Sequence, residues 1–94
     1  MPSRGLFFSP RSRRDLKALP RRDQEIILSD IESLPSGSGL PAPPKVRKLK
    51  GAPNLHRLRT GDYRTIFRLA PDGLFILRIV ARKELERALS GLWA

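Results

Sequence analysis

The chain has 94 residues, and its 19 lysines and arginines outnumber its 9 aspartates and glutamates, which gives a formal net charge of +10. A chain of this length forms one domain, which we expect to span 1–94, and the excess of cations favours a polyanionic partner such as nucleic acid or an acidic protein. The absence of cysteine and the single histidine exclude disulfides and the usual zinc sites. The apolar runs fall well short of the roughly 18 residues of a membrane span. We therefore expect a cytoplasmic protein without metal or other cofactor.

The first third of the chain predicts a short strand followed by two helices. Residues 4–8 are brief and increasingly apolar, which is typical of a strand. Ser9 and Pro10 form a helix-start signal, because a hydroxyl caps the first turn and proline lacks an N–H that this turn would leave unpaired. The helix 10–19 ends before a second proline. Apolar residues then recur at i, i+4 and i+7 within 27–34, so a second helix completes a helical hairpin.

The rest of the chain predicts strands and one more helix. Residues 34–44 contain four prolines and two glycines and therefore predict a loop. Four strand-like segments follow it: 45–50, 54–59, 63–69 and 74–80. Asp72-Gly73 is a strong hairpin signal between the last two, and 83–93 has the leucine spacing of an amphipathic helix. We expect an α+β fold: an N-terminal strand and a helical hairpin packed on a four- to five-stranded, mainly antiparallel sheet, with a short C-terminal helix.

Strand alternation sorts the side chains of the expected sheet onto two faces. The face under the helical hairpin receives His56, Leu58, Tyr63, Phe67, Leu69, Phe75, Leu77 and Ile79. The opposite, uncovered face receives six arginines: Arg57, Arg59, Arg64, Arg68, Arg78 and Arg82. The same alternation places Leu74, Ile76 and Val80 with these arginines.

So many cations on one face of a small sheet point to a ligand. Like charges placed across from one another destabilise a sheet, and the nearby aspartates fall in turns. Arginine is acceptable at single solvent-facing strand positions, but a group of six is better explained by an external anion. Guanidinium groups bind phosphate in a bidentate manner and stack on bases, so RNA or a DNA backbone fits them. Four further cations extend the charge: Lys45, Arg47, Lys48 and Lys50.

Three segments resemble the RelE/ParE superfamily of bacterial toxins: "KLKG" (48–51), "LHRLRTGDYRTIFR" (55–68) and "ARKELERA" (81–88). The resemblance implies the toxin of a type II toxin–antitoxin module, held inactive by an acidic antitoxin. RelE-like members resemble ribosome-dependent endonucleases that cut mRNA without a metal and so block translation. ParE-like members share the fold but inhibit DNA gyrase. The resemblance also implies site residues, which at the matching positions are Arg57, Arg59, Arg64 and Arg82.

The sequence departs from the RelE-like pattern where proton transfer would occur. RelE-like enzymes often have lysines at the paired positions 57 and 59 and a tyrosine near the final helix, where this chain has Leu85 or Glu86. Cleavage by a 2′-hydroxyl needs a proton acceptor, and arginine is effectively always protonated. The remaining candidates for this role are Glu84, Glu86, His56 and Tyr63, of which the last two are expected on the helix-packed face.

We therefore take Glu86 with the four arginines as candidate catalytic residues. The candidate RNA-binding residues are Lys45, Arg47, Lys48, Lys50, Arg68 and Arg78. An mRNA endonuclease, with the ribosome and mRNA as partners, is the first hypothesis. A gyrase inhibitor is the second, and a toxin-like fold that serves only as an antitoxin-bound regulator of transcription stays open.

Overall fold

One sheet and three α-helices make up the regular secondary structure in the computed structural model, which describes residues 5–34, 45–49 and 54–93. The elements in chain order are β1 (Gly5–Phe8), α1 (Pro10–Lys17), α2 (Arg21–Glu32), β2 (Val46–Lys48), β3 (Leu55–Thr60), β4 (Tyr63–Ala70), β5 (Gly73–Ala81), a 3₁₀ turn η1 (Arg82–Glu84) and α3 (Leu85–Trp93). The expected α+β fold is confirmed. The loop predicted at 34–44 lies, after its first residue, outside the described residues, as does Lys50.

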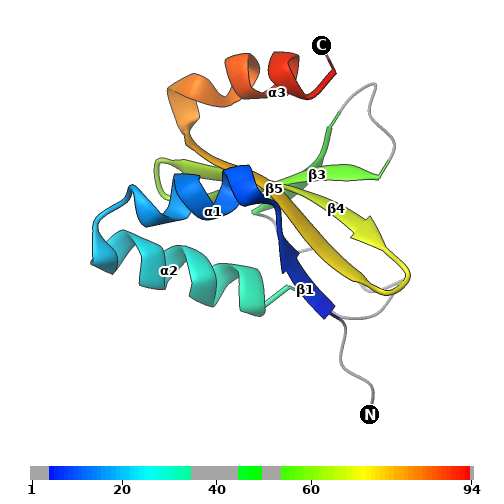
Figure 1. The fold of residues 1–94 in the computed structure, drawn as a ribbon, viewed down its shortest axis with the longest axis horizontal. Helices are drawn as coiled ribbons and strands as arrows, with labels where there is room; N and C mark the ends of the chain where they lie inside the picture. Colours follow the sequence, from blue (N-terminus) through cyan, green and yellow to red (C-terminus); the bar gives the residue numbers. More distant parts are fainter. Residues whose placement is uncertain (1–4, 35–44, 50–53, 94) are drawn as a thin grey trace.

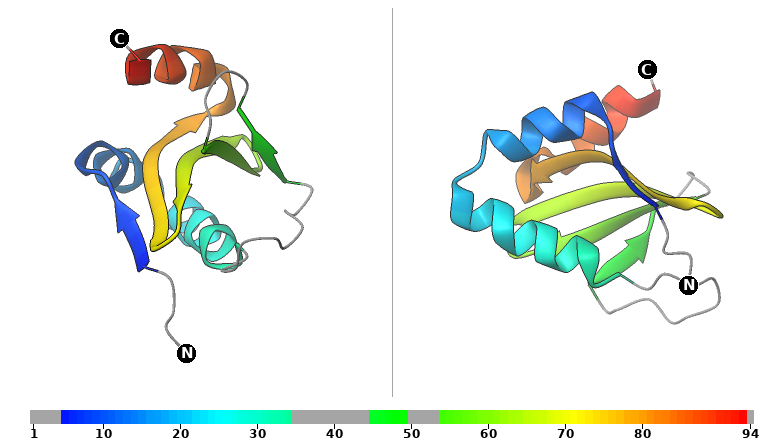
Figure 2. Two further views of the ribbon diagram at one scale, coloured as in Figure 1. Left: turned by 90° about the vertical axis from the view of Figure 1, so that its right-hand side faces the viewer. Right: turned by 60° about the horizontal axis from the view of Figure 1, so that its bottom comes forward.

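The five strands form one sheet in the order β1-β5-β4-β3-β2. β1 runs parallel to β5, and the other neighbours are antiparallel. The helices α1 and α2 lie on one side of this sheet, and α3 lies on the other (Figures 1 and 2). We call these two sides the hairpin face and the α3 face.

The start of α1 follows the chemistry expected of Ser9 and Pro10. Ser9 is the N-cap, and its hydroxyl oxygen accepts a hydrogen bond of 3.0 Å from the backbone N–H of Ser12. Pro10 occupies the first helical position, where its missing N–H costs nothing. Pro20 precedes α2, and its carbonyl accepts from the N–H of Gln24 at 3.0 Å. One proline thus begins the first helix of the hairpin, and the other separates it from the second.

The main core lies between the helical hairpin and the sheet. Its buried members are Ile27, Ile31, Leu34, Leu58, Phe67, Leu74, Ile76 and Ile79. At about 25 cal/mol for each Å² of apolar surface removed from water, these side chains dominate the stability of the fold. They also hold β3 and β4 with their arginines directed to the other face.

A second apolar cluster lies under α3 and corrects the expectation of an uncovered sheet face. Ile66 and Val80 of the sheet are buried against Ala88, together with the partly buried Leu85 and Leu89. The amphipathic helix predicted from leucine spacing is therefore present, but it packs on the face that also carries the arginines. Only the part of this face that α3 leaves free is open to a ligand.

A β-bulge in β5 reverses part of the predicted face assignment. Ile66 pairs with Arg78 whereas Phe67 pairs with Ile76, so Leu77 is an extra residue in β5. Before the bulge, Leu74 and Ile76 therefore face the hairpin core. The expectation that these two share the arginine face is wrong.

Phe75 and Leu77 also lie on the face opposite to the one predicted for them. Phe75 faces the α3 side, since it pairs in register with Arg68, and Leu77 packs in the cluster under α3. The expectation that both lie under the hairpin is also wrong. After the bulge, Ile79 and Val80 take the faces predicted for them.

Candidate nucleic-acid interface

Cations from three neighbouring strands surround a hollow of about 280 Å³ on the α3 face. Its described lining residues are Lys45, Arg47, Arg57, Arg59 and Arg64. The strand register brings them together, because Arg47 of β2 pairs with Arg57 of β3, and Arg59 of β3 pairs with Arg64 of β4. The predicted grouping of arginines from separate strands is thus present for β3 and β4, and Arg47 of β2 extends it as expected. We call this the basic hollow.

Arg64 is the most buried member of the basic hollow, with 8% of its surface exposed. Its Nη1 donates to the carbonyl oxygens of Gly61 and Tyr63, each at 3.0 Å. These neutral acceptors fix the guanidinium without cancelling its charge. Burial therefore lowers the pKa of Arg64 below its ordinary value. Three neighbouring positive charges lower this pKa further: those of Arg57, Arg82 and Arg59.

Arg82 lies at the end of β5, where η1 begins. Its backbone N–H donates to the carbonyl oxygen of Asp62 at 2.7 Å, and its side chain is exposed. Arg82 is not among the described residues that line the basic hollow, but its positive charge is near enough to Arg64 to contribute to the lowering of the Arg64 pKa. The Asp62 carboxylate opposes the lowering of the Arg64 pKa but does not reverse it.

The candidate proton acceptors are directed elsewhere. His56 lies on the hairpin side, where its ring stacks on Phe67 with centroids 5.4 Å apart. The hydroxyl of Tyr63 donates to Asp23 of α2 at 2.7 Å, and this hydrogen bond is the main cause of the raised pKa of the tyrosine. The expected places of His56 and Tyr63 on the helix-packed face are confirmed.

The two glutamates lie at the start of the last helix. Glu84 forms an exposed ion pair of 3.6 Å with Arg87, and Glu86 is exposed in the first turn of α3. Neither is among the described residues that line the basic hollow. The described lining can bind and polarise a phosphate, but it supplies no general base.

Arg78 is not part of the open cationic surface. Its Nε donates to the carboxylate of Asp15 on α1 at 2.8 Å, and its side chain is only 17% exposed. The prediction that its charge meets no internal carboxylate is wrong, because α1 approaches the edge of β5 that β1 leaves free. This carboxylate also accepts from the backbone N–H of Ile79 at 3.0 Å.

The other predicted RNA-binding residues occupy different places. Lys45 lines the basic hollow, although its ammonium group also forms an ion pair with Asp30 of α2. Lys48 pairs in register with His56 and is exposed on the hairpin side of β2. Arg68 is on the α3 face, four residues along β4 from Arg64, and Arg47 is exposed in the lining of the hollow.

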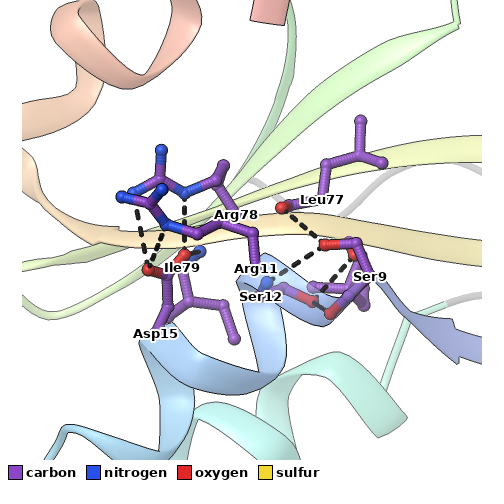
Figure 3. Close-up of polar contacts among 8 residues, drawn as sticks. Ser9, Arg11, Ser12, Asp15, Leu77, Arg78 and Ile79 are labelled. Carbon is purple, nitrogen blue, oxygen red and sulfur yellow. Dashed lines mark hydrogen bonds and ion pairs between the residues drawn. The ribbon is translucent and has the colours of Figure 1, made fainter. Parts of the chain in front are cut away.

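A polar cluster that joins α1 to β5 was not predicted from the sequence. The hydroxyls of Ser9 and Ser12 donate to the carbonyls of Leu77 and Ile76, both at 2.9 Å, while Asp15 binds the next stretch of the strand (Figure 3). The available signal was the spacing of three between residues 9, 12 and 15, which places all three on one side of a helix. These side chains form hydrogen bonds with backbone groups of β5 that a neighbouring strand would otherwise pair.

Two features are absent from the part of the chain that the structure describes. Among them, no group of three or more histidines, aspartates or glutamates could hold a metal ion. No helix in the described part of the chain is both long and apolar enough to cross a membrane.

The fold is that of RelE-like toxins. The Pyrococcus horikoshii OT3 protein from a RelE–RelB complex matches with a TM-score of 0.68 and 26% identity, covering 87% of this chain and 97% of that one. The match to a chain of the Mycobacterium tuberculosis RelBE2 toxin–antitoxin complex has a TM-score of 0.67 and 25% identity, with 87% and 100% covered. YoeB of Staphylococcus aureus shares the fold, with a TM-score of 0.67, 18% identity and coverage of 81% and 93%.

The sequence family agrees with the fold. A family model described as the ParE toxin of the type II toxin–antitoxin system parDE matches residues 6–86. The chain belongs to this family and is thus a type II toxin of the RelE/ParE superfamily. A search of the curated proteins finds no match.

Proposed function

We propose that the protein is an endoribonuclease that cuts mRNA on the ribosome and so blocks translation in the cytoplasm. The observation that carries this proposal is the buried guanidinium of Arg64 in the lining of the basic hollow, where it donates hydrogen bonds to neutral carbonyl oxygens. A phosphodiester held there would meet Arg57 and Arg59 as well, and guanidinium groups match phosphate oxygens in geometry and charge.

The proposed chemistry is attack by the 2′-hydroxyl on the adjacent phosphorus. The new bond joins the 2′ oxygen to phosphorus, the bond to the 5′ oxygen breaks, and the products are a cyclic phosphate and a 5′-hydroxyl end. Negative charge grows on the phosphate oxygens in the transition state, and fixed cations stabilise it. Water takes the proton of the attacking hydroxyl and returns one to the leaving oxygen, because the described lining holds no base. The ribosome would orient the RNA for this attack. The toxin itself would then need to supply mainly the positive charge that stabilises the transition state.

The experiment uses ribosomes that translate a defined message in vitro. Primer extension after addition of the purified toxin should reveal discrete breaks in the coding region. Arg64→Gln should lower the cleavage rate by about 100-fold or more, the usual cost of removing one transition-state contact of this kind. The matched control is Arg13→Gln, since Arg13 is exposed on α1, on the other side of the sheet. Full activity of Arg64→Gln would contradict the proposed site.

Inhibition of DNA gyrase is the second candidate function. It is favoured by the family model, which is that of ParE, and by the lack of a general base among the described residues of the hollow. The same preparation should be added to a gyrase supercoiling assay. Loss of supercoiling at toxin concentrations that leave the translated message uncut would favour this function over RNA cleavage.

An acidic antitoxin is the proposed partner in either case. The P. horikoshii and M. tuberculosis structures described above are toxin–antitoxin complexes, and the net charge of +10 attracts a negatively charged segment. Expression of the chain from its own operon should yield a complex with an acidic protein. A toxin that purifies alone from such cells would contradict this partner.

A further inference from the structure

A row of flat side chains crosses three strands on the α3 face. Phe7 of β1 and Phe75 of β5 are partners in register, and their rings are stacked with centroids 4.8 Å apart and planes 15° apart. Arg68 of β4 follows in register, and its guanidinium carbon lies 5.0 Å from the centre of the Phe75 ring. The row starts at the sheet edge with Phe7, which is 46% exposed. One further flat group can extend the stack there.

The backbone beside this ring leaves room for it. Gly5 and Gly73 are partners in register on the same face, two residues before Phe7 and Phe75. A Cβ atom at Gly73 would lie 2.5 Å from the carbonyl oxygen of Gly5 and 3.0 Å from Cε2 of Phe7, and one at Gly5 would collide with the same ring. The ring therefore occupies room that only glycine leaves free. The exposed ring thus lies beside the backbone of two glycines and against the ring of Phe75.

The row shares its face with the basic hollow. Arg64 of the hollow and Arg68 of the row are four residues apart on β4, a separation of about 13 Å along the strand. Ile66 between them is covered by α3, so a bound strand would pass beside that helix. An apolar peptide would also cover Phe7, but a guanidinium in the stack and the nearby cations favour a polyanion with flat groups.

We infer that Phe7 stacks with an unpaired base of the RNA strand whose phosphate the basic hollow holds. This inference rests on the proposed function, since the ligand is the same RNA, and it adds a contact to the base beside contacts to the backbone. Stacking on an aromatic ring tolerates every base, because each has a flat face. The site would therefore add affinity without selecting a sequence.

The experiment compares two labelled oligomers by fluorescence anisotropy. One is a 2′-O-methyl oligoadenylate, which lacks the attacking hydroxyl and so stays intact, and the other is an abasic oligomer with the same number of phosphates. The natural chain should prefer the oligoadenylate by about fivefold or more. Phe7→Leu should lose this preference while keeping the salt dependence of binding, because the phosphate contacts remain. Phe7→Trp should keep or raise the preference, and circular dichroism melting checks that both variants fold.

The outcomes separate the inference from the proposed function. Equal affinity of the natural chain for the two oligomers, or an unchanged preference in Phe7→Leu, would overturn the stacking site. So would a Phe7→Leu variant that loses only its affinity for the antitoxin, since the ring would then serve a protein partner. An uncut message on the ribosome, with the base preference intact, would defeat the proposed nuclease and leave the stacking site standing.

Discussion

The two faces of the sheet differ in how their charged side chains are paired. On the hairpin side, carboxylates of α1 and α2 reach across to polar groups of the sheet. Asp15 binds Arg78, and Asp23 accepts a hydrogen bond from the hydroxyl of Tyr63. Asp30 of α2 likewise binds a strand hydroxyl and a lysine. Each of these carboxylates therefore connects a helix to the sheet. Each also neutralises a positive charge or accepts the hydrogen bond of a hydroxyl group.

On the α3 face, cations are placed opposite cations. Arg47 pairs with Arg57, and Arg59 pairs with Arg64, although cross-strand pairs of like charge are unfavourable. Among the described residues, carboxylates thus pair with polar groups on the hairpin side, whereas the four arginines of the basic hollow form no ion pair with a carboxylate. This comparison supports the proposal that the arginines of the hollow bind an external anion, at some cost in stability.

The largest expected effect comes from breaking the charge balance of the hairpin side. Asp15→Asn should lower the free energy of unfolding by about 2–3 kcal/mol, because the largely buried Arg78 loses its charged partner. Urea unfolding followed by circular dichroism measures this. The matched control is Glu25→Gln, which removes an exposed pair of 3.9 Å with Arg21 and should change stability by at most about 0.5 kcal/mol. Equal effects of the two substitutions would contradict the structural role of Asp15.

On the α3 face, a substitution that removes a charge repulsion is expected to raise the free energy of unfolding. Arg59→Glu should raise the free energy of unfolding by about 0.5–1 kcal/mol, because an attractive cross-strand pair with Arg64 replaces a repulsive one. Added salt should shrink the gain, since it screens both interactions. Arg59→Gln, which only removes the repulsion, should lie between the two. A destabilised Arg59→Glu protein at low salt would show that the arginines of the hollow do not strain the fold.

The smallest expected effect is a pH dependence at Asp30. Burial pushes the pKa of this carboxyl up, but hydrogen bonds from Lys45 and Thr60 and the charge of Lys45 outweigh it and hold the pKa below its ordinary value. The stabilisation is therefore complete above the unfolded-state pKa of about 3.9 and is lost as the pH falls through the lower folded-state pKa. Asp30→Asn should be less stable than the natural chain at pH 7, and the difference should shrink as the pH falls below 4. A difference that stays constant with pH would contradict this linkage.

The sequence predicts the elements and the basic face of β3 and β4 because simple periodicity governs them. Arg57, Arg59 and Arg64 alternate with residues of the main core, so parity alone assigns their face. Parity fails in 74–80, where the apolar residues form a nearly continuous run. Such a run indicates a strand covered on both faces, which the structure confirms through α3 on the second face. The bulge at Leu77 then shifts the phase, and a one-residue shift moves every preceding side chain to the other face.

The pairing of Arg78 with Asp15 lay beyond local reasoning for a different reason. The two residues are 63 positions apart, and their contact depends on where α1 crosses the edge of β5. Sequence spacing places Ser9, Ser12 and Asp15 on one side of a helix but does not identify the strand that they meet. The interaction belongs to the tertiary fold.

The hydrogen bonds between α1 and β5 also restrict the length of the segment that connects β1 to α1. Phe8 pairs in register with Ile76, and the backbone N–H of Ser9 donates to the carbonyl oxygen of Ile76 at 2.9 Å, so one extra residue between Phe8 and Ser9 would displace the start of α1 from the strand. Chimeras built from related toxins must therefore exchange the first helix and the fifth strand together. A boundary drawn between them would join two halves that do not fit.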